Sequence, residues 1–363
     1  MSPLLLRLDQ KLRVSKDARS RAELKTKQAG YYARIGNFVA AKSIITELRR
    51  EFGDGHNGRI TVCIMISEAL IHHYENLSSN ALDRIIRAQF ISRLINDSQL
   101  EAISSAWRAH IEFDSSKFEE MFVSLRCAID KVSPSNYDAL ARVSNIICKV
   151  AILCGATDIA KEYFKIGREH ALREGDQAGI EAIQHNKAAF RLSRIRSMRC
   201  LGDIDAREVI EVRVEIETAR SLQNLVRVTA LASYIDLCHA RLLIMEDRFQ
   251  EAVDCLIEIK DHGPYPVGSF APEVIDMEVS YCYGVMGNLD KALLLFERNK
   301  LEHLKLLDPD ERLVVRWMQL QLALKDYRFG DIDASKAAFD SSVIEYIELM
   351  KKLQKNINGL SII

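Results

Sequence analysis

The chain has few of the residues that interrupt helices. It contains 16 glycines and 6 prolines in 363 residues, and three of those prolines lie together in Pro264–Pro272. Because glycine and proline are the strongest breakers of regular structure, the long stretches without them leave room for helices. They leave little room for the dense turns of a β-sandwich or barrel.

Long apolar runs, clustered cysteines and net charge are also missing. The N-terminal apolar run, Leu4–Leu6, is broken at Arg7 and is too short for a signal peptide, and no run approaches the ~18 residues of a membrane span. The eight cysteines form no CxxC and lie mostly in apolar stretches, as in proteins of a reducing compartment. A net charge of −1 provides no overall attraction to nucleic acid or membrane. These features predict a cytoplasmic protein.

A short motif recurs along the chain. In "MGNLDKALLLF" a small residue, Gly287, is followed by Leu289, Ala292 and Phe296. Copies of varying strength are anchored at Gly36, Asn76, Ser116, Gly155, Gly202, Asp247, Gly287 and Gly330. The intervals are 40, 40, 39, 47, 45, 40 and 43 residues. Periods between 20 and 50 residues indicate stacked structural repeats.

Each position of the motif has a physical role in a pair of helices. The small residue allows the chain to reverse, and the alanine lies where two helices cross and a larger side chain would separate them. The aromatic residue lies on the same helix face as the alanine, so it fills the next gap. The pattern predicts an all-α array of about eight antiparallel helix pairs. We expect a capping helix in residues 1–21 and one repeat domain over residues 22–363, with a softer seam near residues 165–200.

The motif resembles the tetratricopeptide repeat family at its turn, alanine and aromatic positions. The repeats are longer than usual for that family, and they lack its early Trp and its final Pro. The longer unit is similar to repeats of bacterial signal-sensing regulators and kinesin light chains. The resemblance covers about residues 22–360 and implies a right-handed α-solenoid with a concave groove that binds peptides. One fold serves many functions, so the partner stays unidentified.

Two histidine-containing stretches are the nearest approach to a metal site. In "HHYE" the adjacent His72 and His73 point about 100° apart on a helix, so they cannot easily bind one ion. The stretch "HIEFD", with His110 and Asp114, is rejected for a similar reason, and ordinary packing is the favoured interpretation. The sequence has no GxSxG, Walker or GxGxxG motif. We therefore predict no enzymatic activity, no metal and no cofactor.

Positive charge recurs on one projected face at mid-chain. Counting back from the anchors places these residues on the groove side of the first helices: Arg142, Asn145, Lys149, Arg196, Arg199, Tyr234 and Arg241. Trp107 is a groove candidate from the third repeat. Arginines bind carboxylates through paired hydrogen bonds, so this face favours an acidic partner segment. Alternatively, the arginines pair internally with acids such as Glu208, Glu211 and Glu215.

The leading functional hypothesis is a non-catalytic scaffold that binds a partner polypeptide in its groove. The alternative is a peptide-responsive sensor or regulator subunit of a signalling or defence system. Nucleic-acid binding is less favoured because basic and aromatic residues are not interleaved. Neither the partner's identity nor the oligomeric state follows from the sequence.

Overall fold

The computed structural model describes residues 2–53, 58–76, 80–203, 205–230, 232–262, 271–298, 304 and 307–360. Over these residues the chain is 86% helical, with seventeen α-helices and no strand. The predicted all-α class is therefore confirmed.

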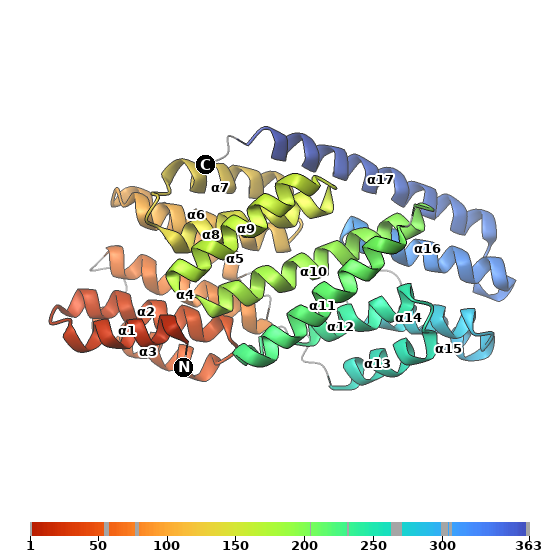
Figure 1. The fold of residues 1–363 in the computed structure, drawn as a ribbon, viewed down its shortest axis with the longest axis horizontal. Helices are drawn as coiled ribbons and strands as arrows, with labels where there is room; N and C mark the ends of the chain where they lie inside the picture. The colour runs from red at the N-terminus through yellow and green to blue at the C-terminus, as the bar shows by residue number, and fades with distance from the viewer. Residues whose placement is uncertain are drawn as a thin grey trace.

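Eight helix pairs follow the first helix, α1 (Pro3–Val14), along an elongated array (Figure 1). The pairs are α2 (Ala18–Arg34) with α3 (Phe38–Phe52), α4 (Gly58–Asn76) with α5 (Asn80–Leu94), α6 (Ser98–Asp114) with α7 (Phe118–Lys131), α8 (Tyr137–Leu153) with α9 (Thr157–Glu174), α10 (Gln177–Cys200) with α11 (Ala206–Val226), α12 (Ala232–Met245) with α13 (Phe249–His262), α14 (Ala271–Val285) with α15 (Leu289–Arg298), and α16 (Pro309–Lys325) with α17 (Ile332–Asn358). A short 3₁₀ helix, η2 (Tyr327–Phe329), precedes the last turn. The longest interval in the sequence reflects the 24 residues of α10.

In seven of the eight pairs the turn lies at the residue that the motif marks. Positive φ angles occur at seven of the eight anchors: Gly36, Ser116, Gly155, Gly202, Asp247, Gly287 and Gly330. Glycine tolerates this conformation best, and at Gly36 a side chain would also collide with Thr229, whose Oγ1 lies 2.3 Å from an ideal Cβ position. The motif therefore predicts seven corners correctly, because a tight turn requires a particular backbone conformation at a single residue.

The alanine of the motif is buried where the helices of a pair cross. Ala41, Ala252 and Ala292 have no exposed surface, which confirms the predicted burial of Ala292. The first helices of successive pairs also pack side by side, as α2 does on α4 and α6 does on α8. The buried apolar side chains form several clusters that succeed one another along the array. This arrangement is that of a helical repeat array, in which each unit packs mainly on its neighbours.

The array also makes contacts between distant repeats. The backbone N–H of Thr229, after α11, donates to the carbonyl oxygen of Ile35, after α2, at 3.1 Å. At the other end α16 packs on α10, and α17 packs on α8. Lys352 of α17 forms an ion pair with Glu119 of α7. The array is therefore bent so that its first and last pairs meet its middle.

The N-terminal helix is shorter than the predicted capping segment, because α1 ends at Val14 and α2 begins at Ala18. Leu4, Leu5 and Leu8 of α1 are buried against α2 and the start of α10. The backbone N–H of Leu4 donates to the carbonyl oxygen of Gly175 at 3.1 Å. Thus α1 connects the first pair to the fourth and fifth pairs.

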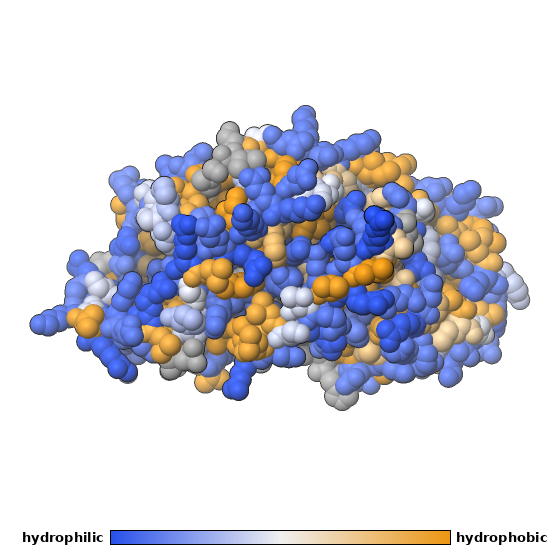
Figure 2. All heavy atoms as spheres, in the orientation of Figure 1, coloured by the Kyte–Doolittle hydropathy of each residue, from blue (hydrophilic) through white to orange (hydrophobic). Residues whose placement is uncertain are grey.

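The outer surface shown in Figure 2 is mostly hydrophilic, with apolar side chains in short separate groups. Among the described helices, none combines the length and apolarity that crossing a bilayer would require. The proline-rich segment Asp261–Glu273, which the sequence favours as the longest connection between helices, lies mostly outside the described residues, since α13 ends at His262 and α14 begins at Ala271.

Candidate functional site: a cavity on the first-helix face

A cavity of about 300 Å³ opens on the face formed by the first helices of the array. Its walls come from α2, α4, α6 and the start of α8, and it is bounded by α1 and the turn between α9 and α10. Pockets of this size are at the lower end of those that bind small ligands. We call this space the first-helix cavity.

Apolar side chains make up much of its surface. Ile66 and Leu70 come from α4, and Leu100, Ile103 and Trp107 come from α6. They are spaced by three or four residues along each helix, so each set lies on one face. This surface can bind an apolar side chain, and Trp107 adds a flat aromatic ring.

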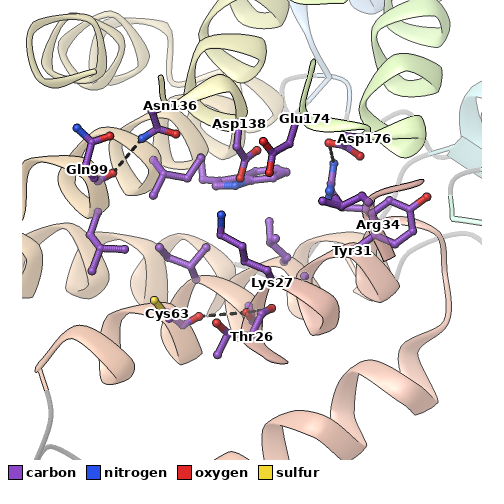
Figure 3. Close-up of a pocket in the computed structure, with 18 of the residues that line it drawn as sticks. Thr26, Lys27, Tyr31, Arg34, Cys63, Gln99, Asn136, Asp138, Glu174 and Asp176 are labelled. Carbon is purple, nitrogen blue, oxygen red and sulfur yellow. Dashed lines mark hydrogen bonds and ion pairs between the residues drawn. The ribbon is translucent and has the colours of Figure 1, made fainter. Parts of the chain in front are cut away.

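Three charged groups line the cavity without an ion pair among the residues that the structure describes. Asp138 and Glu174 point into the cavity from one wall, and Lys27 points toward them from the other (Figure 3). Burial raises the pKa of Glu174, and the negative charge of Asp138 raises it further, whereas Lys27 lowers it. These side chains are available to an occupant.

A buried ion pair closes one end of the cavity. Arg34 Nη1 of α2 donates to Asp176 Oδ2 at 2.5 Å, and both side chains are less than a tenth exposed. The Oδ1 atom of Asp176 also caps α10 by accepting from the N–H of Gly179 at 3.0 Å. Burial alone would raise the pKa of Asp176, but the charge and hydrogen bond of Arg34 outweigh it and lower that pKa. The pair joins residues 142 positions apart, so it connects the first repeat to the fifth.

Arg142 lies next to the wall of the first-helix cavity, where its guanidinium stacks on the ring of Trp107, 3.7 Å from the ring centroid. Arg142 is 4% exposed, and its Nε atom has no hydrogen-bond partner among the described residues. The sequence predicted Arg142 as a groove residue. The structure places it beside a residue that lines the cavity.

The histidines that the sequence assigned to packing are brought together by the fold. The Nε2 atoms of His73 and His110 each lie 3.3 Å from Asp114 Oδ2, and Lys149 Nζ lies 2.7 Å from Asp114 Oδ1. His73, His110 and Asp114 form the described group closest to a metal-ligand set. However, the Lys149 ammonium already neutralises Asp114 and would repel a cation. We therefore interpret the cluster as an ion-paired network in which the two histidines and Lys149 are buried and Asp114 reaches the surface.

The pKa values of this cluster follow from burial and charge. Burial lowers the pKa of His110 well below its usual value despite the nearby carboxylate, and it lowers the pKa of Lys149 as well. Burial would raise the pKa of Asp114, but Lys149 and His110 hold it well below its usual range.

Two of the predicted groove arginines are paired inside the protein. Arg196 of α10 and Arg241 of α12 both donate to Glu278 of α14, which is fully buried. Arg241 also donates to Glu311 of α16 at 2.8 Å. The acidic groups that face this part of the predicted groove therefore come from the chain's own C-terminal repeats.

The other predicted groove residues have mixed surroundings. Arg199 donates to Asp247 Oδ1 at 2.9 Å and to the carbonyl oxygen of Ile244 at 3.1 Å. Asn145 is buried and accepts from Asn186 at 3.3 Å, and Tyr234 is half-buried on α12. These residues do not form one shared surface with the first-helix cavity.

Other basic residues of α10 pair internally with glutamates, which is the alternative that the sequence left open for the mid-chain positive charge. Arg191 pairs with Glu211 and Glu215, and Lys187 pairs with Glu215 at 2.9 Å. Arg194 pairs with Glu208 at 3.2 Å.

Sequence reasoning missed most of the cavity. Only Trp107 was a groove candidate, whereas Asp138, Glu174 and Lys27 gave no signal in isolation. The same count back from the anchor Gly36 picks out Thr26 and Gly30, which line the cavity, but not Lys27, which lies nine residues before that anchor. Glu174 is the last residue of a second helix, α9, so no count along the first helices would find it.

Comparisons with known proteins support the fold. No protein-family model matches the chain, and no curated protein matches it in sequence. Among solved structures, the chain is similar to a Rap protein in complex with competence and sporulation factor. That likeness has a TM-score of 0.57 at 12% identity, and it covers 94% of this chain and 92% of the Rap chain.

Proposed function

We propose that the chain is a non-catalytic, cytoplasmic interaction protein that binds a partner peptide in the first-helix cavity. The observation that carries this proposal is the cavity itself, which combines an apolar surface with charged groups of both signs that form no ion pair with any described residue. Such a mixture is typical of sites that bury part of a ligand and orient it by a few polar contacts. The likeness to a Rap protein solved with a bound factor also supports a binding role.

A peptide is favoured over a large folded partner by the shape of the site. A cavity of about 300 Å³ accommodates a few side chains, whereas a stable interface between folded proteins buries a much larger surface. The eight cysteines are free thiols, which supports the cytoplasmic assignment.

A sensor or regulator role is the second candidate, and it is favoured by contacts between distant repeats. The Arg34–Asp176 pair forms one end of the cavity and also joins the first repeat to the fifth. A ligand that competes for Arg34 would weaken this connection and change the curvature of the array. Ligand binding at the cavity would then also alter the hydrogen bonds between Thr229 and Ile35, which join the first repeat to the fifth.

A displayed random-peptide library tests the proposal directly. We expect the wild-type chain to select peptides, and Ile103→Trp to lose that selection because the larger side chain fills the cavity. Val123→Trp is the matched control, since Val123 is 60% exposed on α7, away from the cavity walls. Equal enrichment by all three proteins, or no enrichment by the wild type, would contradict the proposal.

A further inference from the structure

Arg142 differs from the other arginines that lie mostly inside the array. Arg34, Arg196 and Arg241 each donate to at least one carboxylate. Arg142 is 4% exposed, yet it makes no hydrogen bond or ion pair with a described residue, and its Nε atom is buried without a partner. A buried charge without a counter-ion is costly, so the position is not explained by stability alone.

The surroundings of Arg142 compensate only part of that cost. The Trp107 ring provides a cation–π contact at 3.7 Å, which is weaker than the paired hydrogen bonds of a carboxylate. Burial lowers the pKa of Arg142, and the nearby Tyr74 and Asp138 act in the opposite direction without reversing the shift. The Arg142 guanidinium therefore has N–H groups that can still donate to an acceptor.

These N–H groups of Arg142 lie close to the first-helix cavity. Asp138 lines the cavity in the first turn of α8, and Arg142 lies one turn further along the same helix face. The Trp107 ring that carries the guanidinium is itself part of the cavity wall. A group that enters past Trp107 would meet Arg142 next.

We propose that Arg142 is the anchor for a single carboxylate of the bound peptide, either its C-terminus or an acidic side chain. This inference rests on the proposed peptide-binding function. A carboxylate matches the planar guanidinium through two parallel hydrogen bonds, which are strong where water is excluded. Polyanions such as nucleic acid are disfavoured, because Asp138 and Glu174 line the same cavity.

Trp107 provides the reporter for a test. The chain has two tryptophans, so Trp317→Phe leaves Trp107, at the cavity wall, as the single tryptophan, and excitation at its red edge avoids the tyrosines. Two random hexapeptide mixtures serve as probes. The first has free carboxyl termini and contains Asp and Glu, and the second has carboxamide termini with Asn and Gln in their place. We expect the carboxylate mixture to change the Trp107 emission at concentrations about 30-fold or more below those needed for the amide mixture.

Variants of Arg142 separate an anchor from a structural residue. Arg142→Met should abolish the difference between the two mixtures and should raise the melting temperature of the free protein, because a buried unpaired charge is removed. Arg142→Lys should retain part of the preference. Arg194→Met is the matched control, because Arg194 pairs with Glu208, does not line the cavity, and should leave the preference unchanged.

Each other outcome identifies which idea fails. If both mixtures bind equally, or if Arg142→Met keeps the preference, the carboxylate anchor is wrong while peptide binding stands. If Arg142→Met lowers the melting temperature and leaves the preference intact, Arg142 is structural. If neither mixture changes the emission of Trp107, both the anchor and the proposed function are overturned.

Discussion

Replacing Asp176 by Asn tests whether the Arg34–Asp176 pair holds the first and fifth repeats together. Asn can still cap α10 through its side-chain oxygen, so the substitution removes the charge and keeps the local geometry. Arg34 would then remain buried without its counter-ion. Because removal of one partner of a buried ion pair costs about 3–5 kcal/mol, and Asn can still accept one hydrogen bond, we expect a loss near 3 kcal/mol.

The expected change in melting temperature follows from the size of the chain. Unfolding entropy is about 2.1 cal/mol/K per residue, so 363 residues give roughly 760 cal/mol/K. A loss of about 3 kcal/mol then lowers the melting temperature by about 4 °C when the array unfolds in one transition. Circular dichroism would follow the helices, and Trp107 emission in the Trp317→Phe background would follow the cavity.

The pH dependence of stability tests the direction of the pKa shift of Asp176. The pKa of Asp176 in the folded protein lies below its unfolded value, so the pair stabilises the fold above that unfolded value, near pH 4, and the contribution is lost as the pH falls through the folded pKa. The difference between the wild type and Asp176→Asn should therefore be full at pH 7 and shrink below about pH 4.

A double-mutant cycle separates the pair from other effects. Arg34→Met with Asp176→Asn removes both charges, so the double variant should recover much of the stability that Asp176→Asn loses. A coupling energy near zero, or an Asp176→Asn protein that melts like the wild type, would refute the reasoning that this pair joins the two repeats.

Three further predictions concern packing and protonation. Ala292→Leu should destabilise the protein by about 1–3 kcal/mol in urea unfolding, because Ala292 has no exposed surface at its helix crossing, and wild-type stability would contradict that packing. Gly36→Ala should cost more than Gly287→Ala in the same assay, since both need positive φ but only Gly36 faces Thr229 at 2.3 Å; equal losses would show that the contact relaxes freely. Burial raises the pKa of Glu181 to about 7, so the folded state holds a proton that the unfolded state releases near pH 4.5. Stability should therefore fall by roughly 3 kcal/mol between pH 4.5 and 7 in the wild type and stay flatter in Glu181→Gln, and parallel pH curves would argue against the assignment.

The sequence alone determined the repeat architecture. The anchor residues predicted seven corners of the helix pairs, including the degenerate copy at Ser116 and the copy at Asp247, two residues that adopt the positive φ of the glycine anchors. These positions are readable because a turn needs particular backbone conformations and a helix crossing needs a small side chain, and both demands act on single residues. The same local logic predicted the burial of Ala292.

The cavity and the partners of the arginines were decided only by the tertiary structure. Arg196 and Arg241 have the same appearance in the sequence as Arg142, yet the first two meet Glu278 and Arg142 meets no described acid. Small rotations between successive helix pairs add up along the array, and their sum decides which distant side chains meet. A periodic pattern records each corner but not that sum, so the contact of Arg34 with Asp176, 142 residues away, depends on the packing of every pair between them.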